Sequence, residues 1–223
     1  MFEALEFSRR EMLAVSLAMG GVLLSGPLAP LFAQSPTMRP TSEQGMGPFY
    51  PVAKPADRDA DLTVIPGRPG KAKGQILYLG GCVFNLKGQP QTGVDVEIWQ
   101  ANAAGRYTHP LDENRAPLDP NFEGYGVCTT DAEGRYAFKT VKPAPYPAES
   151  GWTRPPHIHF QVTGPVTRFV TQMYFPGEPL NEKDRLFRTA EDKESLIAKL
   201  SPAAKDAEAG ALLAAWDIVL PRT

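Results

Sequence analysis

Two histidines one residue apart, His157 and His159, are the most informative chemical group in this sequence of 223 residues. Alternate residues of a β-strand project to the same face of a sheet, so a strand here would point both imidazoles one way and Ile158 and Phe160 the other. Paired imidazoles supply half of a typical transition-metal site. Histidines that only hydrogen-bond at a sheet surface would give the same pattern, so a metal site needs further ligands.

Arg154 lies just before this pair, and the intervening Pro155-Pro156 suits the start of a strand. Its guanidinium would place a positive charge beside the site, although a surface salt bridge is the simpler role for an isolated arginine. The preceding region offers one more histidine together with carboxylates and tyrosines: His109, Asp112, Glu113, Asp119, Glu123, Asp131, Tyr107, Tyr125, Tyr136 and Tyr146. A cupin site is disfavoured, because Thr163 and Gly164 stand where that motif requires a glutamate.

Tyrosinate oxygen is the remaining kind of ligand. A phenol with its ordinary pKa of about 10 is a poor ligand, but a trivalent iron lowers that pKa far enough to hold the phenolate. Two tyrosinates and two neutral imidazoles would suit Fe(III), because two anionic oxygens stabilise the ferric state relative to the ferrous state. The residues alone leave open which tyrosines take part.

A series of short phrases between Gly80 and Phe175 carries a specific family resemblance. The phrases are Val96–Asn102, Gly105–Tyr107, Asp119–Phe122, Thr130–Tyr136, Lys142–Pro147, Arg154–His159 and Thr171–Phe175. In this order they resemble the catalytic domain of the intradiol ring-cleavage dioxygenases, the family of protocatechuate 3,4-dioxygenase and catechol 1,2-dioxygenase. Several independent motifs in a fixed order are far more specific than any one of them.

The resemblance implies four ligands for one Fe(III) per chain. Tyr107 matches the first ligand tyrosine of the family and Tyr146 matches the second, while His157 and His159 match its histidine pair. The family arrangement would put Tyr107 and His157 in the equatorial plane, with Tyr146 and His159 axial. His109 is assigned to a loop, without a role.

The resemblance also implies a reaction and two further site residues. Arg154 matches the arginine that steadies negative charge on the bound substrate, and Gln172 matches a polar residue near it. The implied enzyme inserts both atoms of O2 into a catechol-type diol of the protocatechuate, catechol or hydroxyquinol class and yields a cis,cis-muconate-type diacid. Tyr146 would leave the iron and take a substrate proton, which makes it both ligand and base.

Two departures from the family pattern bear on substrate and assembly. Ala148 follows Pro147 where the protocatechuate-type catalytic subunit has a tryptophan soon after its second tyrosine. The catechol-type enzymes have a long helical N-terminal domain, whereas Gln34–Gly74 shows no helical pattern. The chain is therefore nearer the protocatechuate type or another, exported branch of the family. The expected assembly is a homo-oligomer or a hetero-oligomer with a related subunit.

The main rival interpretation is an exported, metal-free, transthyretin-like β-sandwich binding module. It accounts for the strands and the leader but not for the joint occurrence of the tyrosines, Arg154 and the histidine pair. An iron-free relative of the catalytic subunit is disfavoured too, because all four ligand types are present.

An all-β fold has to position these residues, since short apolar runs alternate with Gly- and Pro-containing turns. The strands that we predict are 76–84, 94–99, 126–130, 135–141, 157–163, 168–175 and part of 211–220. Their spacing predicts a β-sandwich of mostly antiparallel strands with long active-site loops and one short helix near the C-terminus. That helix is predicted at Ala190–Leu200 with Thr189 as its N-cap, and Tyr125, Tyr136 and Tyr174 are assigned to core packing.

The N-terminal region predicts a twin-arginine signal peptide over residues 1–33, an extended arm over 34–74 and the catalytic domain over 75–223. Arg9 and Arg10 precede an apolar core, Met12–Leu24, which is shorter than the roughly 20 residues that span a bilayer. We therefore expect a periplasmic or extracellular protein with no stable membrane span after processing.

Charge and cysteine content add two smaller constraints. A net charge of −2 argues against a nucleic-acid binder. Cys82 and Cys128 are the only cysteines, and they could form a disulfide or remain two separate buried thiols.

Overall fold

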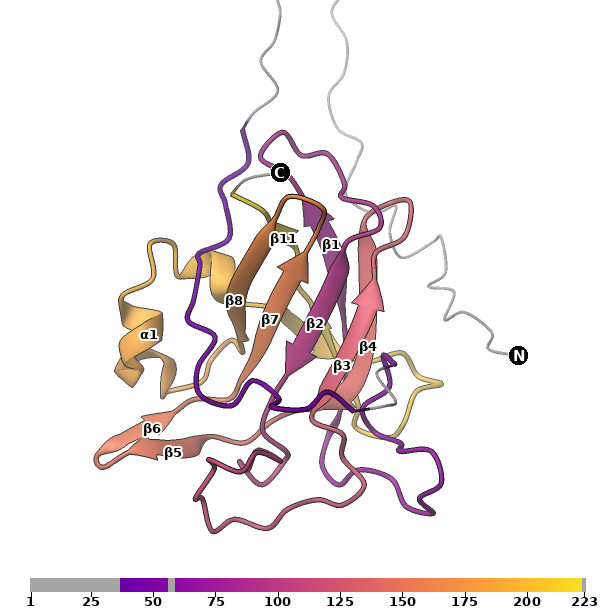
Figure 1. Ribbon diagram of the computed structural model, residues 1–223, viewed down its shortest axis with the longest axis vertical. Coiled ribbons are helices and arrows are strands. Elements are labelled where there is room, and N and C mark those ends of the chain that lie inside the picture. Colours follow the sequence, from indigo (N-terminus) through magenta and orange to yellow (C-terminus); the bar gives the residue numbers. More distant parts are fainter. Residues whose placement is uncertain (1–36, 56–58, 222–223) are drawn as a thin grey trace, which may run out of the picture. The chain divides into compact units, whose positions relative to one another are not determined.

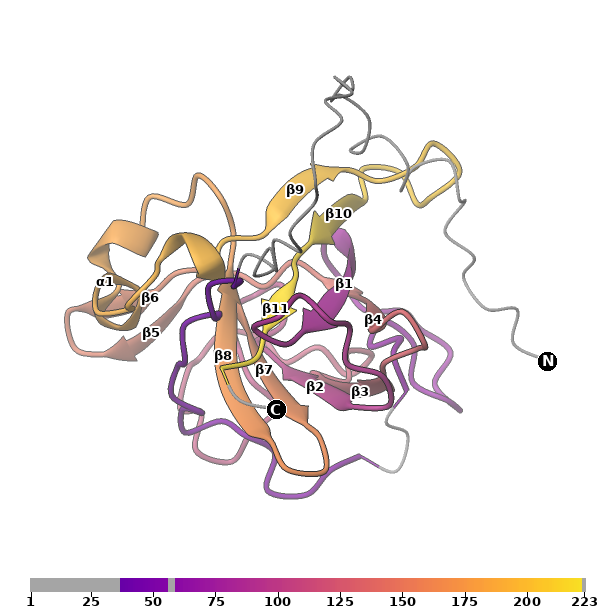
Figure 2. The same cartoon turned by 90° about the horizontal axis from the view of Figure 1, so that it is seen from above.

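The computed structural model describes residues 37–55 and 59–221, in which two β-sheets pack against each other (Figure 1, Figure 2). Side chains of both sheets share one core, which includes Leu77 and Phe138 from one sheet and Ile98 and Phe160 from the other. The predicted β-sandwich is confirmed. The signal peptide predicted for residues 1–33 lies outside the described residues.

The first sheet contains five strands: β1 (Ile76–Phe84), β4 (Arg135–Val141), β9 (Lys199–Pro202), β10 (Leu212–Ala215) and β11 (Ile218–Val219). The second contains four, in the spatial order β3 (Tyr125–Thr129), β2 (Asp95–Trp99), β7 (His157–Thr163) and β8 (Arg168–Tyr174). A separate hairpin joins β5 (Tyr146–Glu149) to β6 (Trp152–Arg154). All these pairings are antiparallel except those of β1 with β10 and β11.

Register across the second sheet sets a row of polar and aromatic residues side by side. His159 on β7 lies opposite Trp99 on β2 and opposite Gln172 on β8. His157 lies opposite Tyr174 on β8. One-residue slips would send every one of these side chains into the core, so the apolar residues between them fix the register.

Helical structure is sparse and lies after β8. It consists of the α-helix α1 (Arg185–Arg188) and the 3₁₀ turns η1 (Asn181–Lys183) and η2 (Glu194–Leu196). The prediction of a helix over Ala190–Leu200 is wrong, and Thr189 caps the C-terminal end of α1. Tertiary contacts override the helical pattern here. The Ala198 N–H donates to the Tyr174 carbonyl oxygen, and the chain then pairs as β9 with β10.

The predicted final strand is present in two pieces, β10 and β11, with Trp216 and Asp217 between them. Gly81 of β1 allows the Trp216 backbone to lie close to β1, because a Cβ at Gly81 would lie 1.8 Å from the Trp216 carbonyl oxygen. Cys82 and Cys128 are half-buried free thiols. Within the described ranges, no helix has the length and apolarity to cross a membrane.

Candidate active site

The histidine pair lies where the alternation of β7 predicts. Ile158 and Phe160 are fully buried in the core between the sheets. His157 and His159 project together from the other face, with their Nε2 atoms 3.3 Å apart. Both side chains are buried, at 2% and 1% exposure, so this face is a covered site and not a hydrated sheet surface.

The hydrogen bonding of His157 fixes its tautomer. Its Nδ1 lies 2.7 Å from the Pro155 carbonyl oxygen, which can only accept, so Nδ1 carries the proton. Nε2 therefore presents a lone pair toward His159. Burial, assisted by the charge of Arg154, holds the pKa of each imidazole well below its usual value. Both are neutral at physiological pH, which is the state that ligates metals.

The two tyrosines implied as ligands reach the same place from different elements. Tyr107 comes from the loop between β2 and β3, where its N–H donates to Asp112, and Tyr146 begins β5. Their ring centroids are 5.3 Å apart. The Tyr146 ring lies 5.6 Å from that of His157, and the Tyr107 ring lies 6.3 Å from that of His159. The structure thus brings the four predicted ligands together.

Burial raises the pKa of both phenols above the usual value, most strongly for Tyr107. The Tyr107 hydroxyl is buried without a hydrogen bond of good geometry, and the Tyr146 phenol is its main polar neighbour. The charge of Arg154 opposes the rise at Tyr146. Without a cation both phenols stay protonated, so a strongly charged metal would be needed to ionise them.

Arg154 and Gln172 belong to one buried polar network beside the ligands. The Arg154 Nη2 donates to Gln172 Oε1 at 2.7 Å and to the Tyr174 hydroxyl at 2.8 Å, while its Nε donates to Asp184 at 2.6 Å. Burial by itself would lower the pKa of Arg154, but Tyr174, Tyr146 and Asp184 outweigh it and raise that pKa. The guanidinium remains charged, as its predicted role requires.

Three residues beside the ligands have roles that the sequence did not reveal. Tyr174, predicted to pack in the core, is fully buried but hydrogen-bonds Arg154 and stacks on His157 with centroids 5.8 Å apart. Trp99 stacks nearly parallel on His159, at 4.9 Å. Along the predicted strand 94–99, Trp99 alternates with Ile98 and shares a face with Glu97, and a tryptophan on that polar face was the available signal. Asp184 gave no sequence signal.

The N-terminal arm covers the tyrosine side of the site and passes beside the second sheet (Figure 1). The Phe49 ring packs on Tyr107 with centroids 4.6 Å apart. The next residue, Tyr50, donates a hydrogen bond of 2.7 Å to the Glu97 carboxylate, which also pairs with Lys54 at 2.9 Å. These contacts shield the phenols from water and attach the N-terminal arm to β2.

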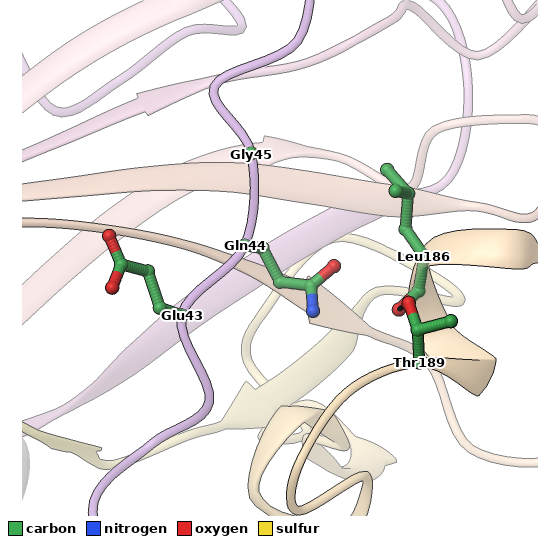
Figure 3. A pocket seen from close by; sticks show the side chains of 5 residues that line it. All are labelled: Glu43, Gln44, Gly45, Leu186 and Thr189. Atoms are coloured by element: carbon green, nitrogen blue, oxygen red, sulfur yellow. Dashed lines mark hydrogen bonds between the residues drawn. The ribbon is translucent and has the colours of Figure 1, made fainter.

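A pocket of about 390 Å³ lies between the arm and the helix α1 (Figure 3). Its lining residues are Glu43, Gln44, Gly45, Leu186 and Thr189. The Gln44 amide points toward Leu186 and Thr189, whereas the Glu43 carboxylate lies on the other side of the arm (Figure 3). The Gly45 carbonyl oxygen accepts from Gln172 Nε2 at 2.9 Å, so this pocket borders the Arg154 network.

A second pocket, of about 260 Å³, lies beside Tyr107. It is lined by Arg106–Pro110 and Leu118, and so includes Tyr107 and His109. His109 contacts the edge of Phe49, with ring centroids 5.7 Å apart.

The residues present fit a ferric ion better than a divalent metal of the usual kind. No group of three or more His, Cys, Asp and Glu side chains in residues 37–55 and 59–221 could hold a metal. The oxygen groups that lie beside this histidine pair are the phenols of Tyr107 and Tyr146. Within the described part of the chain, the Tyr107 hydroxyl is buried without a hydrogen-bond partner. The two imidazole Nε2 atoms have, among the described residues, only each other as a partner, at 3.3 Å. A cation between these groups would bind the phenol oxygen and both nitrogen lone pairs.

Comparisons with known proteins found similar sequences and similar structures. A protein-family model described as "Dioxygenase" matches residues 46–222. The protocatechuate 3,4-dioxygenase beta chain of Burkholderia cepacia is 41% identical over 202 residues, which cover 87% of this chain and 83% of that protein. The dioxygenase domain of a dioxygenase carbohydrate-binding protein fusion from Streptomyces sp. SirexAA-E is a similar structure. Its TM-score is 0.63 at 30% identity, covering 83% of this chain and 100% of that one.

Two further relatives are longer proteins. Catechol 1,2-dioxygenase of Candida albicans is 29% identical, covering 68% of this chain and 52% of that protein. Hydroxyquinol 1,2-dioxygenase of a Rhizobium species is 31% identical, covering 69% and 52% respectively. This chain therefore spans about half the length of these two relatives.

Proposed function

The chain belongs to the intradiol ring-cleavage dioxygenase family, and on that premise we propose that it cleaves a catechol-type diol at one non-haem Fe(III). Tyr107, Tyr146, His157 and His159 would hold the ion. The convergence of these four buried side chains carries the proposal. When bound, ferric iron would supply a Lewis acid that ionises the phenols and withdraws electron density from the diol, which makes a ring carbon reactive toward O2.

The protein's own groups have three tasks in this reaction. Tyr146 accepts a proton from the substrate at its phenolate oxygen and so acts as an internal base. Arg154 offsets negative charge that develops on the substrate oxygens, and Gln172 holds the guanidinium by its Nη2 edge. Phe49 and Trp99 exclude water, which strengthens both effects by lowering the local dielectric.

The substrate class is proposed as a single-ring aromatic diol of the protocatechuate, catechol or hydroxyquinol type, with O2 as the second substrate. The names of the relatives cover all three, and the product would be a cis,cis-muconate-type diacid. The beta-chain name of the B. cepacia relative supports an assembly with a related subunit, with a homo-oligomer as the other possibility.

Oxygen uptake with a panel of diols tests the proposal. Protein reconstituted with iron should consume O2 with at least one of protocatechuate, catechol and hydroxyquinol, and metal analysis should give about one iron per chain. Protein reconstituted with zinc, and chelator-treated protein, are the matched controls and should be inactive. Turnover that persists without iron, or an active preparation containing zinc or copper and no iron, would reject the proposed cofactor.

We also propose export through the twin-arginine pathway, which rests on Arg9, Arg10 and the short apolar core that follows. Replacing both arginines by lysine keeps the charge and should stop export, because the receptor reads the arginine pair. The mature N-terminus should fall near Gln34. A native protein that keeps its leader and stays in the membrane would identify the segment as an anchor.

A further inference from the structure

Asp184 is a fully buried carboxylate that bonds in two directions. Its Oδ2 accepts from the Nε of Arg154 at 2.6 Å. Its Oδ1 accepts from the N–H of Phe187 at 2.8 Å and so caps the first turn of α1. The residue therefore connects the segment after β8 to the guanidinium beside the ligand cluster.

The guanidinium of Arg154 is held along two edges. Two residues of β8, Gln172 and Tyr174, accept hydrogen bonds from Nη2, whereas Asp184 alone accepts from Nε. A planar guanidinium held at one corner can swing about that contact, whereas acceptors on two edges fix its plane. Since Arg154 faces Tyr146 across the β5–β6 hairpin, this plane sets where the positive charge lies relative to that phenol.

The residue after Asp184 contacts the same hairpin. The Arg185 guanidinium lies 4.8 Å from the centroid of the Trp152 ring on β6, and it pairs with Glu149 on β5 at 3.2 Å. The exposed Arg185–Glu149 pair contributes little energy. Two consecutive residues, Asp184 and Arg185, nevertheless attach the start of α1 to the hairpin, and the contact made by Asp184 is the buried one.

We propose that Asp184 is a positioning residue for ring cleavage, which fixes the guanidinium of Arg154 toward the reacting oxygens. This inference rests on the role proposed above for Arg154. Asp184 lies in the 175–198 segment, outside the ligand motifs, and on this inference it controls the rate of the chemical step.

Asp184→Asn is the most direct test, because the amide oxygen can still cap α1 while its NH2 faces a donor on Arg154. The kcat should fall about 10- to 100-fold, as for other groups that orient residues around a metal site, with a smaller change in KM. Glu178→Gln is the matched control: Glu178 precedes Asp184 in the same segment and pairs with Lys142, not with Arg154. It should leave kcat within about twofold of wild type.

A double-mutant cycle with Arg154→Ala separates positioning from a general structural role. If Asp184 acts through Arg154, adding Asp184→Asn to Arg154→Ala should lower kcat by no more than about twofold further. Full additivity of the two losses would refute the inference. So would an Asp184→Asn enzyme of normal kcat beside an impaired Arg154→Ala enzyme, an outcome that leaves the role of Arg154 intact. Normal turnover in Arg154→Ala would instead overturn the proposed function of Arg154 itself.

Asp184→Asn leaves a buried cation without its carboxylate and could fail to fold. Asp184→Glu covers that case, because it keeps the charge but moves the carboxylate by one methylene. It should retain its iron content and melt within a few degrees of wild type while kcat falls about tenfold. Folded Asp184→Glu protein with unchanged kcat would equally contradict the inference.

Discussion

Gly47 in the N-terminal arm makes a contact that a single methyl group would disrupt. Its φ is +71°, a conformation that costs an L-residue about 1–2 kcal/mol. A Cβ at this position would also lie 3.2 Å from the Cε1 atom of His159 and 3.8 Å from its Nε2. Gly47→Ala should therefore both strain the backbone and press on a ligand imidazole.

The two effects have different expected magnitudes. Backbone strain of about 1–2 kcal/mol should lower the melting temperature by roughly 2–8 °C for a chain of this size. The His159 ring, which is stacked on Trp99, must move by a few tenths of an ångström to accommodate the methyl group. Displacements of that kind at reacting groups reduce turnover by about tenfold or more.

Two glycines of the same chain separate these effects. Gly93 has φ +69°, and a methyl group added there would meet nothing within 4 Å, so Gly93→Ala should lower the melting temperature similarly and keep kcat. Gly45 has an ordinary φ and equally open space, so Gly45→Ala should change neither by much. Calorimetry and steady-state oxygen uptake measure both quantities. If Gly47→Ala loses no more activity than Gly93→Ala, the arm does not control the position of His159.

Four substitutions and a pH series also test the site. Arg154→Ala should cost about 2–4 kcal/mol in kcat/KM with iron retained, and Arg154→Lys should recover only part of this, because lysine lacks the planar fork. His159→Ala should lose iron, whereas Tyr107→Phe should alter the visible absorption of the iron-loaded protein; metal analysis and spectra check both. Burial and the charge of Arg154 lower the pKa of His157 and His159, so below about pH 6.5 the unfolded chain binds more protons than the folded chain. Urea unfolding of metal-free protein should therefore show that the free energy of unfolding decreases as the pH is lowered below about 6.5, by up to about 1.4 kcal/mol per pH unit for each histidine. An unchanged free energy of unfolding between pH 7 and 5.5 would contradict the burial of both histidines as neutral groups.

The sequence predicted the elements whose pattern is local. The strands over 76–84, 135–141 and 157–163 have the predicted bounds, because alternation and flanking turn residues define them. The projection of His157 and His159 from the same face of the sheet followed from the same alternation. The family motifs then identified Tyr107 and Tyr146, which no local rule could select from the other tyrosines.

The features that were missed depend on contacts between distant segments. Asp184 acts only because the segment after β8 returns to β6, and nothing within that segment indicates the return. Tyr174 was within reach, because the predicted strands 157–163 and 168–175 are joined by a short turn, and pairing them as a hairpin sets Tyr174 opposite His157. The 190–200 segment has a helical pattern, yet it forms only the 3₁₀ turn η2. Contact with Tyr174 and pairing with β10 make the chain extended from residue 197 onward.

Identification of the ring-cleavage product tests the central claim most directly. Iron-loaded protein is incubated with catechol and O2, or with the diol of highest activity, and the product is followed by ultraviolet and visible absorption and by mass spectrometry. Cleavage between the two hydroxyl-bearing carbons predicts cis,cis-muconate or its substituted form, which absorbs in the ultraviolet. A yellow muconic semialdehyde, formed by cleavage beside the hydroxyl-bearing carbons, would contradict the account.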